Sequence, residues 1–328
     1  MDKRIFVVLG MARSGTSAIA KALEVLGVDL GNKLLSARGV NPKGFYEDTE
    51  IMYDINRRVV DVLGNPWISS DSFIVHPALQ PYKNKAIILL NQRFSNTSCW
   101  GFKDPRTVGM LHFWQNIFCE MQLDDNYVIT MRHPLSSAYS NFHYMRTDIE
   151  VGLIQWMTSL ISAIDNTNGK KRVLVSYELM LENPKNQLER MHQQLSLDAA
   201  LSHAKANEYT NHFLDKSLRH HAFDETELDS KPVIQFAPLC SSMYTLLLKV
   251  AKDEMTLDSE AFQAEWKNIR NEFFSVYPVF LYVKKILAHR KLLQREIRLV
   301  HKSLLWKLLN PLRQLTNILK RKRQFNGA

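Results

Sequence analysis

The sequence predicts an α/β protein in which helices flank a parallel β-sheet, with a helical extension at the C-terminal end. In the first half of the chain, short apolar, β-branched or aromatic runs alternate with longer stretches of helical periodicity. This alternation is typical of βαβ units. Eleven of the twelve glycines lie at or before Gly169. A loop that needs glycine for close backbone approach therefore belongs to the same half.

The expected strands fall at intervals along this half. They are Ile5–Leu9, Cys99–Phe102, Tyr127–Met131 and Val173–Val175. The first strand is followed by a helix whose apolar positions end at Leu26, with Gly27 as its C-cap. Ligands of parallel sheets bind beyond the carboxyl ends of the strands, so the residues that follow each run form the candidate site.

The pattern changes near residue 241 to long helical stretches, 261–277 and 279–301, separated by Pro278. We therefore expect two parts, residues 1–240 with the sheet and residues 241–328 as the extension. The net charge of +9 is concentrated at the end: thirteen Lys and Arg against one acid from residue 284 onward give +12 and leave −3 for the rest.

Residues 284–323 combine leucine with most of these cations. This composition is typical of an amphipathic helix in contact with an anionic membrane. A solvated surface helix packed on the body is the competing explanation. Nucleic-acid binding is not expected, because aromatic residues are sparse in this segment.

The cysteine count and the hydropathy exclude several classes of protein. Three cysteines are too few and too scattered for a disulfide framework or a zinc cluster, which indicates reduced thiols. Apolar runs are too short for a secretory signal or a membrane-spanning helix. We therefore expect a cytoplasmic protein whose basic end is a candidate for peripheral contact with the inner face of the membrane.

The strongest local signal is the segment Gly10–Ser17, which follows the first expected strand and opens the first helix. Helix N-terminal amides, hydroxyls and two glycines suit such a loop to cradling a phosphate. In nucleotide kinases, a lysine after the second glycine reaches the β- and γ-phosphates. Here Thr16 occupies that position and the cation comes earlier, at Arg13. The loop therefore favours a single phosphate-type group over a triphosphate.

Polar clusters also follow the other expected strands. They are Lys103–Arg106, Arg132–Pro134 with Ser140, and Ser176–Glu178. Pro134 suits the first turn of a helix, which would carry Ser140 about two turns in. Arg132 and Ser140 are thus placed to grip one phosphate together, the arginine through its planar fork. Salt bridges or core packing explain each cluster singly, whereas four at one sheet edge favour a binding site.

These motifs, with the run 173–184, resemble the sulfotransferases that use 3′-phosphoadenosine 5′-phosphosulfate (PAPS), over about residues 4–197. The resemblance implies a P-loop-type, sulfotransferase-like sheet and sulfuryl transfer from PAPS to a hydroxyl, without a metal. It places the 5′-phosphosulfate on the loop, the 3′-phosphate on the arginine–serine pair and adenine on a tyrosine. The matching positions are Arg13, Ser14, Gly15, Thr16 and Ser17 for the loop, Arg132 and Ser140 for the pair, and Tyr177 for adenine.

One element of the family is missing. Small-molecule members close the 3′-phosphate with a late, glycine-rich basic loop, and no glycine lies between Lys170 and Asn326. Arg219, His220 and His221 are candidates to replace it, although a surface cluster explains them better. The departure shifts the expectation to the branch that modifies polysaccharides, and so to a carbohydrate acceptor.

Glu47 resembles the glutamate base that follows the first helix in carbohydrate sulfotransferases, with Asp48 and Asp104 as rivals. Arg13 and Lys103 are candidates to stabilise the negative charge that develops on the leaving oxygen. For any one carboxylate, a cap or salt bridge explains the residue equally well. Two other functions stay open. One is a P-loop kinase using ATP and magnesium, against which Thr16 argues, and the other is a non-catalytic, nucleotide-binding scaffold at the membrane.

Overall fold

The computed structural model describes residues 3–39, 41–64, 66–74, 76–215, 223, 237–303 and 306, the side chains of residues 237 and 291 excepted. The chain divides into two compact units, Met1–Arg270 and Asn271–Ala328. The division into functional parts at residue 240 stays a prediction. Arg219, His220, His221 and most of the segment after residue 303 lie outside the described residues.

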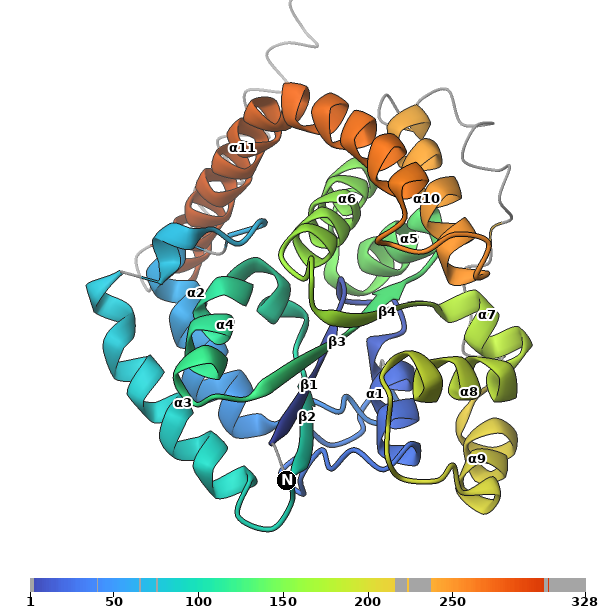
Figure 1. Ribbon diagram of the computed structural model, residues 1–328. Helices are drawn as coiled ribbons and strands as arrows, with labels where there is room; N and C mark the ends of the chain where they lie inside the picture. The colour runs from blue at the N-terminus through green and yellow to red at the C-terminus, as the bar shows by residue number, and fades with distance from the viewer. Residues whose placement is uncertain are drawn as a thin grey trace, which may run out of the picture. The chain divides into compact units, whose positions relative to one another are not determined.

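The first unit is built on a parallel β-sheet, drawn in the middle of Figure 1. Within the described residues, its strands are β1 (Arg4–Leu9), β2 (Cys99–Lys103), β3 (Asp124–Met131) and β4 (Lys171–Ser176), in the order β2-β1-β3-β4. Every neighbouring pair is parallel. The predicted fold class, a parallel sheet flanked by helices with a helical C-terminal part, is confirmed.

One group of helices packs on the side chains of Phe6, Val8 and Val128, which belong to one buried cluster. It comprises α1 (Thr16–Val25), α7 (Tyr177–Glu182), α8 (Pro184–Gln194), α9 (His203–Glu208) and the π-helical turn η5 (Tyr209–Phe213). These helices gather beside the sheet in Figure 1. Phe6 and Val8 are alternate residues of β1, so every second residue of the strand faces these helices. The residues between them face the opposite side of the sheet, which is why the whole run is apolar.

A second group contacts β3, β4 or the helices next to them. It comprises η4 (Pro105–Met110), α4 (Leu111–Glu120), α5 (Pro134–Met145), α6 (Ile149–Asp165) and α10 (Ala237–Ala251). The chain between β1 and β2 adds η1 (Ile51–Asn56), α2 (Arg57–Leu63), η2 (Asp71–Phe73), η3 (Pro77–Leu79) and α3 (Gln80–Arg93). Helix α3 contacts both α4 and η1, so this long connection is anchored beside the sheet.

The strand order creates a crevice between β1 and β3. The chain leaves β1 for β2 on one side and then returns to β3 on the other side. In the register of the sheet, Val8 lies beside Lys103 and Leu9 beside Ile129. Connections on opposite sides of β1 leave room at the carboxyl ends of these strands, where ligands of such sheets bind.

Helix α11 (Glu260–Lys302) contains Pro278 in its interior. The two helices that the sequence predicted on either side of this proline are one helix, so the predicted break is wrong. Proline removes one backbone donor. The contact between the rings of Phe273 and Phe280, whose centres lie 5.6 Å apart, spans the position. It stabilises the helix across the missing hydrogen bond.

In the described part of the chain, no helix combines the length and the apolar character needed to cross a bilayer. The cytoplasmic location expected from the sequence stays a prediction.

Candidate active site

The loop between β1 and α1 passes twice through the left-handed backbone region. Arg13 has a φ of 73° and Gly15, which caps α1, has a φ of 84°. The backbone N–H groups of Ala18 and Ile19 donate to the Gly15 carbonyl. A positive φ at a residue with a side chain costs about 1–3 kcal/mol and persists where surrounding contacts fix it. The predicted phosphate loop is therefore a tight turn, fixed at the N-terminus of a helix.

The ring of Tyr177 lies against this loop. Tyr177 begins α7 directly after β4, and a Cβ atom at Gly15 would lie 2.6 Å from its Cγ atom. A glycine is therefore needed where ring and loop meet. The guanidinium of Arg132 lies 5.2 Å from the centre of the same ring. Clusters that follow three different strands thus meet at one aromatic side chain.

Arg13 and Arg132 approach each other at the start of the crevice. Arg13 Nε donates to Ser140 Oγ at 3.0 Å, and its guanidinium lies 4.4 Å from the centre of the Tyr144 ring. Arg132 Nη1 donates to the Arg13 carbonyl at 3.1 Å. Burial lowers the pKa of Arg13, because the cation is removed from water. Two guanidinium groups and a hydroxyl are therefore in place to bind the oxygens of an anion.

Helix α5 approaches the loop through serines. Arg132 and Ser140 are predicted from the sequence to bind one phosphate together, which stays a prediction, and in the structure the Ser140 hydroxyl accepts from Arg13. One turn earlier, Ser137 Oγ lies 3.3 Å from Ser14 Oγ. Ser137 and Tyr144 were not predicted, because only the fold shows that this helix runs beside the loop.

Glu47 and Lys103 form a buried ion pair. Lys103 Nζ donates to Glu47 Oε1 at 2.7 Å and lies 3.3 Å from Ser17 Oγ. The second oxygen, Oε2, is buried and has no hydrogen-bond partner among the described residues. Burial raises the pKa of Glu47, and Lys103 opposes that shift; burial also lowers the pKa of Lys103. A carboxylate with a raised pKa and an unused oxygen can accept a proton.

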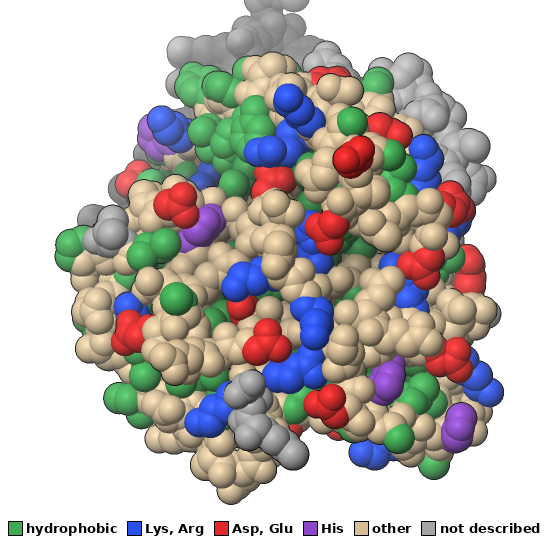
Figure 2. Space-filling view, in the orientation of Figure 1, with side chains coloured by type: hydrophobic (Ala, Val, Ile, Leu, Met, Phe, Trp, Pro, Cys, Tyr) green, Lys and Arg blue, Asp and Glu red, His purple; other side chains and the backbone are tan. Residues whose placement is uncertain are grey.

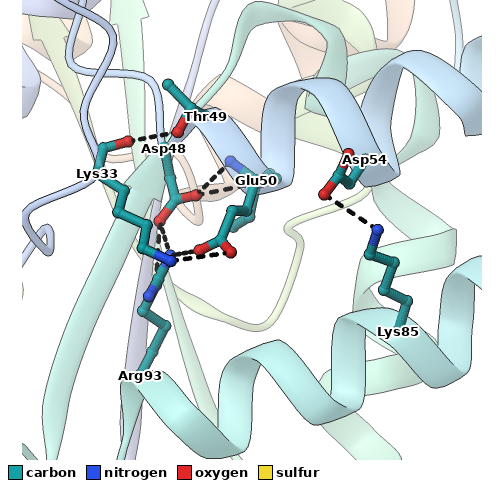
Figure 3. A network of polar contacts seen from close by, with 8 residues as sticks. Lys33, Asp48, Thr49, Glu50, Asp54, Lys85 and Arg93 are labelled. Carbon is teal, nitrogen blue, oxygen red and sulfur yellow. Dashed lines mark hydrogen bonds and ion pairs between the residues drawn. The ribbon is translucent and has the colours of Figure 1, made fainter.

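The neighbouring carboxylate, Asp48, lies in a different network (Figure 3). Its Oδ2 accepts from Nε and Nη2 of Arg93 at 3.0 and 2.8 Å. Its Oδ1 accepts from the backbone N–H groups of Glu50 and Ile51 at the start of η1. Glu50 also pairs with Arg93 and with Lys33. Both oxygens of Asp48 are therefore engaged in holding the chain after Glu47 against the end of α3.

Asp104, the other rival, is engaged in a similar way. It caps η4 by accepting from the Arg106 N–H at 2.9 Å, and it pairs with the guanidinium of the same arginine. Its Oδ2 also accepts from Asn56 Nδ2 at 3.1 Å. Neither Asp48 nor Asp104 lines the cavity described next.

A cavity of about 340 Å³ opens over the carboxyl end of the sheet. Eight of the ten predicted site residues line it: Glu47, Lys103, Arg13, Gly15, Thr16, Ser17, Arg132 and Tyr177. Ser14 and Ser140 lie behind this lining, 1% and 3% exposed. The charged lining residues are four cations and two acids, Lys43 and Asp215 being the ones not predicted. Lys and Arg side chains also gather in the middle of the face drawn in Figure 2. This excess of cations favours an anionic ligand.

A second cavity, of about 550 Å³, lies next to the first. The two share Pro42, Lys43 and Phe213 as lining residues. Tyr46 lines the second cavity and the next residue, Glu47, lines the first, so this part of the chain borders both cavities. Among the described residues, no group of three or more His, Cys, Asp or Glu side chains is arranged to hold a metal ion.

Comparison with known proteins gives structural neighbours only. No protein-family model matches the chain, and no curated protein matches it. The chain is similar to a sulfotransferase domain from the curacin biosynthetic pathway, with 13% identity, a TM-score of 0.40, and coverage of 75% of this chain and 98% of that one. It is similar to a sulfotransferase domain from the Synechococcus PCC 7002 olefin synthase, with 15% identity, a TM-score of 0.36, and coverage of 83% and 96%. It is also similar to a sulfotransferase from Mycobacterium tuberculosis H37Rv, with 13% identity, a TM-score of 0.35, and coverage of 68% and 74%.

Proposed function

We propose that this protein is a sulfotransferase that moves a sulfuryl group from PAPS to a hydroxyl of a carbohydrate. The observation that supports it most is the meeting of four sequence clusters in one cationic cavity. The loop after β1, Lys103 at the end of β2, Arg132 after β3 and Tyr177 after β4 all line it. A donor with a nucleoside and two separate anionic groups matches two guanidinium groups that lie over the aromatic rings of Tyr144 and Tyr177.

The residues divide between the two ends of the donor. The loop amides, with Ser17 and Thr16, would hold the 5′-phosphosulfate, and Arg132 with Ser140 the 3′-phosphate. Because Arg13 Nε already donates to Ser140 Oγ at 3.0 Å, Arg13 would stand between the two anions. The Tyr177 ring would stack on adenine. Bound in this way, the donor supplies an activated sulfuryl group, and no metal is required by the proposal.

Transfer would form a bond between the acceptor oxygen and sulfur and break the bond from sulfur to the 5′-phosphate oxygen. Glu47 Oε2 would take the proton of the acceptor hydroxyl, since it lacks a partner and its pKa is raised by burial. Lys103 and Arg13 would stabilise the negative charge that appears on the leaving bisphosphate. Lys103 Nζ lies 2.7 Å from Glu47 Oε1 and 3.3 Å from Ser17 Oγ, so it contacts both the proposed base and the loop that would hold the donor.

The second cavity supports the choice of a carbohydrate acceptor. It shares Pro42, Lys43 and Phe213 with the first cavity, and Tyr46 and Tyr209 also line it. The rings of Tyr46 and Phe213 meet edge to face at 5.8 Å. Tyr46 has a φ of 59°, in the left-handed region, and lines the second cavity, whereas Glu47 lines the first. Aromatic faces beside polar side chains are suited to stacking on sugar rings.

Calorimetry tests the donor. Adenosine 3′,5′-bisphosphate should bind at least about tenfold more tightly than AMP, because two charge-assisted hydrogen-bonding groups contact its 3′-phosphate. Arg132→Met and Ser140→Ala should reduce this ratio and leave AMP binding nearly unchanged. Ser136→Ala on the same helix is the matched control, because its buried hydroxyl has no hydrogen-bond partner among the described residues. Tighter binding of ATP with magnesium than of the bisphosphate would favour the kinase instead.

The acceptor has its own test. Tyr46→Ala should weaken binding of cellotetraose or tetragalacturonate severalfold and leave bisphosphate affinity unchanged. Tyr53→Ala is the control, because Tyr53 is a partly exposed tyrosine that lines neither cavity. A transfer assay with labelled PAPS and a panel of oligosaccharides then separates an enzyme from a scaffold. Bisphosphate binding without transfer to any member of the panel would favour the scaffold.

A further inference from the structure

Helix α11 exposes a row of apolar side chains in the second unit. Val279, Tyr282, Ile286, Leu293, Ile297 and Val300 follow one another at intervals of three, four or seven residues. Each is at least half exposed, from 50% for Ile286, Leu293 and Val300 to 65% for Tyr282. At 3.6 residues per turn, this spacing places all six on one side of the helix. Leu292 and Leu299, 57% and 61% exposed, lie to one side of this row, beyond Glu296.

The same stretch carries a strong positive charge. Residues 284–302 contain seven Lys and Arg against one acid, Glu296, which gives +6. Arg295, Arg298 and Lys302 are exposed and fall, by the same helical spacing, on the side opposite to Leu293 and Val300. The end of α11 is therefore amphipathic, and it exposes both an apolar and a basic side to solvent. A helix that only packed on its own chain would bury the apolar side.

We infer that residues 279–302 of α11 lie along the surface of an anionic lipid bilayer. The apolar row would enter the boundary between headgroups and acyl chains, as amphipathic interfacial helices do. The long Lys and Arg side chains on the basic side would extend along the helix towards anionic headgroups, each worth several-fold in affinity near a charged surface. This inference does not depend on the proposed sulfotransferase activity. It concerns the described half of the segment that the sequence marked for membrane contact, residues 284–323.

A second copy of the chain is the competing occupant, because the three- and four-residue spacing also suits a coiled coil. The net charge argues against it, because each copy would bring +6 over residues 284–302 to the pair. An anionic bilayer instead attracts this charge.

Vesicle sedimentation with the full chain tests the inference. Wild-type protein should sediment with phosphatidylcholine vesicles that contain phosphatidylglycerol and remain in solution with phosphatidylcholine alone. Leu293→Glu with Ile297→Glu should lower the partition constant at least about tenfold, because charge on the apolar side opposes insertion. Arg295→Glu with Arg298→Glu should lower it by a similar factor, and added salt should weaken binding of the wild type.

Ile88→Glu on α3 is the matched control, because Ile88 is 60% exposed and belongs to the first unit. It should sediment like the wild type. Bisphosphate binding or, if the proposed function fails, the thermal unfolding midpoint shows that each variant is folded. Equal sedimentation of the wild type with both vesicle types would overturn the inference. So would a concentration-dependent dimer, seen by analytical ultracentrifugation and abolished by the Leu293→Glu variant, in a protein that does not bind vesicles.

Discussion

Two adjacent carboxylates, Glu47 and Asp48, are buried to a similar degree and have opposite surroundings. Asp48 accepts hydrogen bonds on both oxygens, from Arg93 and from the backbone at the start of η1. Glu47 shares one oxygen with Lys103 and leaves the other without a partner in the described structure. A saturated carboxylate stabilises a fold, whereas one with an unused oxygen beside a cavity is available for chemistry. The following changes test whether this difference decides function.

The largest effect is expected from Glu47→Gln. Gln keeps an oxygen that can accept from Lys103 but cannot take a proton. Turnover should fall by about 10²–10⁴-fold, the usual contribution of general base catalysis. Bisphosphate affinity should stay close to that of the wild type. Single-turnover transfer from labelled PAPS, with calorimetry on the same sample, measures both.

Asp48→Asn should have the reverse effect, a loss of stability with little loss of turnover. Removing one charge of a buried pair leaves Arg93 undercompensated, at a cost of about 3 kcal/mol in the free energy of unfolding, the low end of the range because Glu50 still pairs with Arg93. Urea denaturation measures this loss. Turnover per folded molecule should fall less than tenfold. If Asp48→Asn instead lost turnover at normal stability, while Glu47→Gln kept its activity, the roles of the two carboxylates would be exchanged.

The sequence alone predicted the strands and helices that carry the site residues better than the contacts between those residues. The strands, the helix capped near Gly27 and the position of Ser140 on α5 follow from local periodicity and turn residues, which act over a few positions. The contact of Gly15 with Tyr177 and the pair formed by Asp48 and Arg93 do not. Their partners are separated by 162 and 45 residues and meet only because of the strand order and the path of α3.

Helix α11 illustrates the same limit. Proline predicts a helix end from local rules, and the aromatic contacts of Phe273 override it. The resemblance favoured Glu47 as the base, and Asp48 and Asp104 stayed rivals because a sequence does not show which oxygens are already bonded. The described hydrogen bonds and the cavity lining separate Glu47 from the two aspartates.

Lys103→Met should move the pH dependence of turnover. Burial raises the pKa of Glu47 and Lys103 opposes the shift, so removal of Lys103 should raise that pKa further. The base works when deprotonated, and activity falls as the pH drops through its pKa. The acid limb of the profile should therefore move to higher pH. Its position, rather than the height of the profile, is the measurement. A limb that stayed in place would show that another group controls it.

The smallest effect is expected from Ser17→Ala. The Ser17 hydroxyl donates to the Phe45 carbonyl at 3.0 Å and lies 3.3 Å from Lys103 Nζ, so it joins the loop to the ion pair. Its loss should cost about 1 kcal/mol, or roughly fivefold in turnover, as for one ordinary hydrogen bond. Ser95→Ala is the matched control, because its hydroxyl donates to the Gln92 carbonyl beside Arg93, next to the other carboxylate. It should leave turnover unchanged. An equal loss in both variants would mean that turnover responds to general loosening, and the distinction between the two carboxylates would then have no functional meaning.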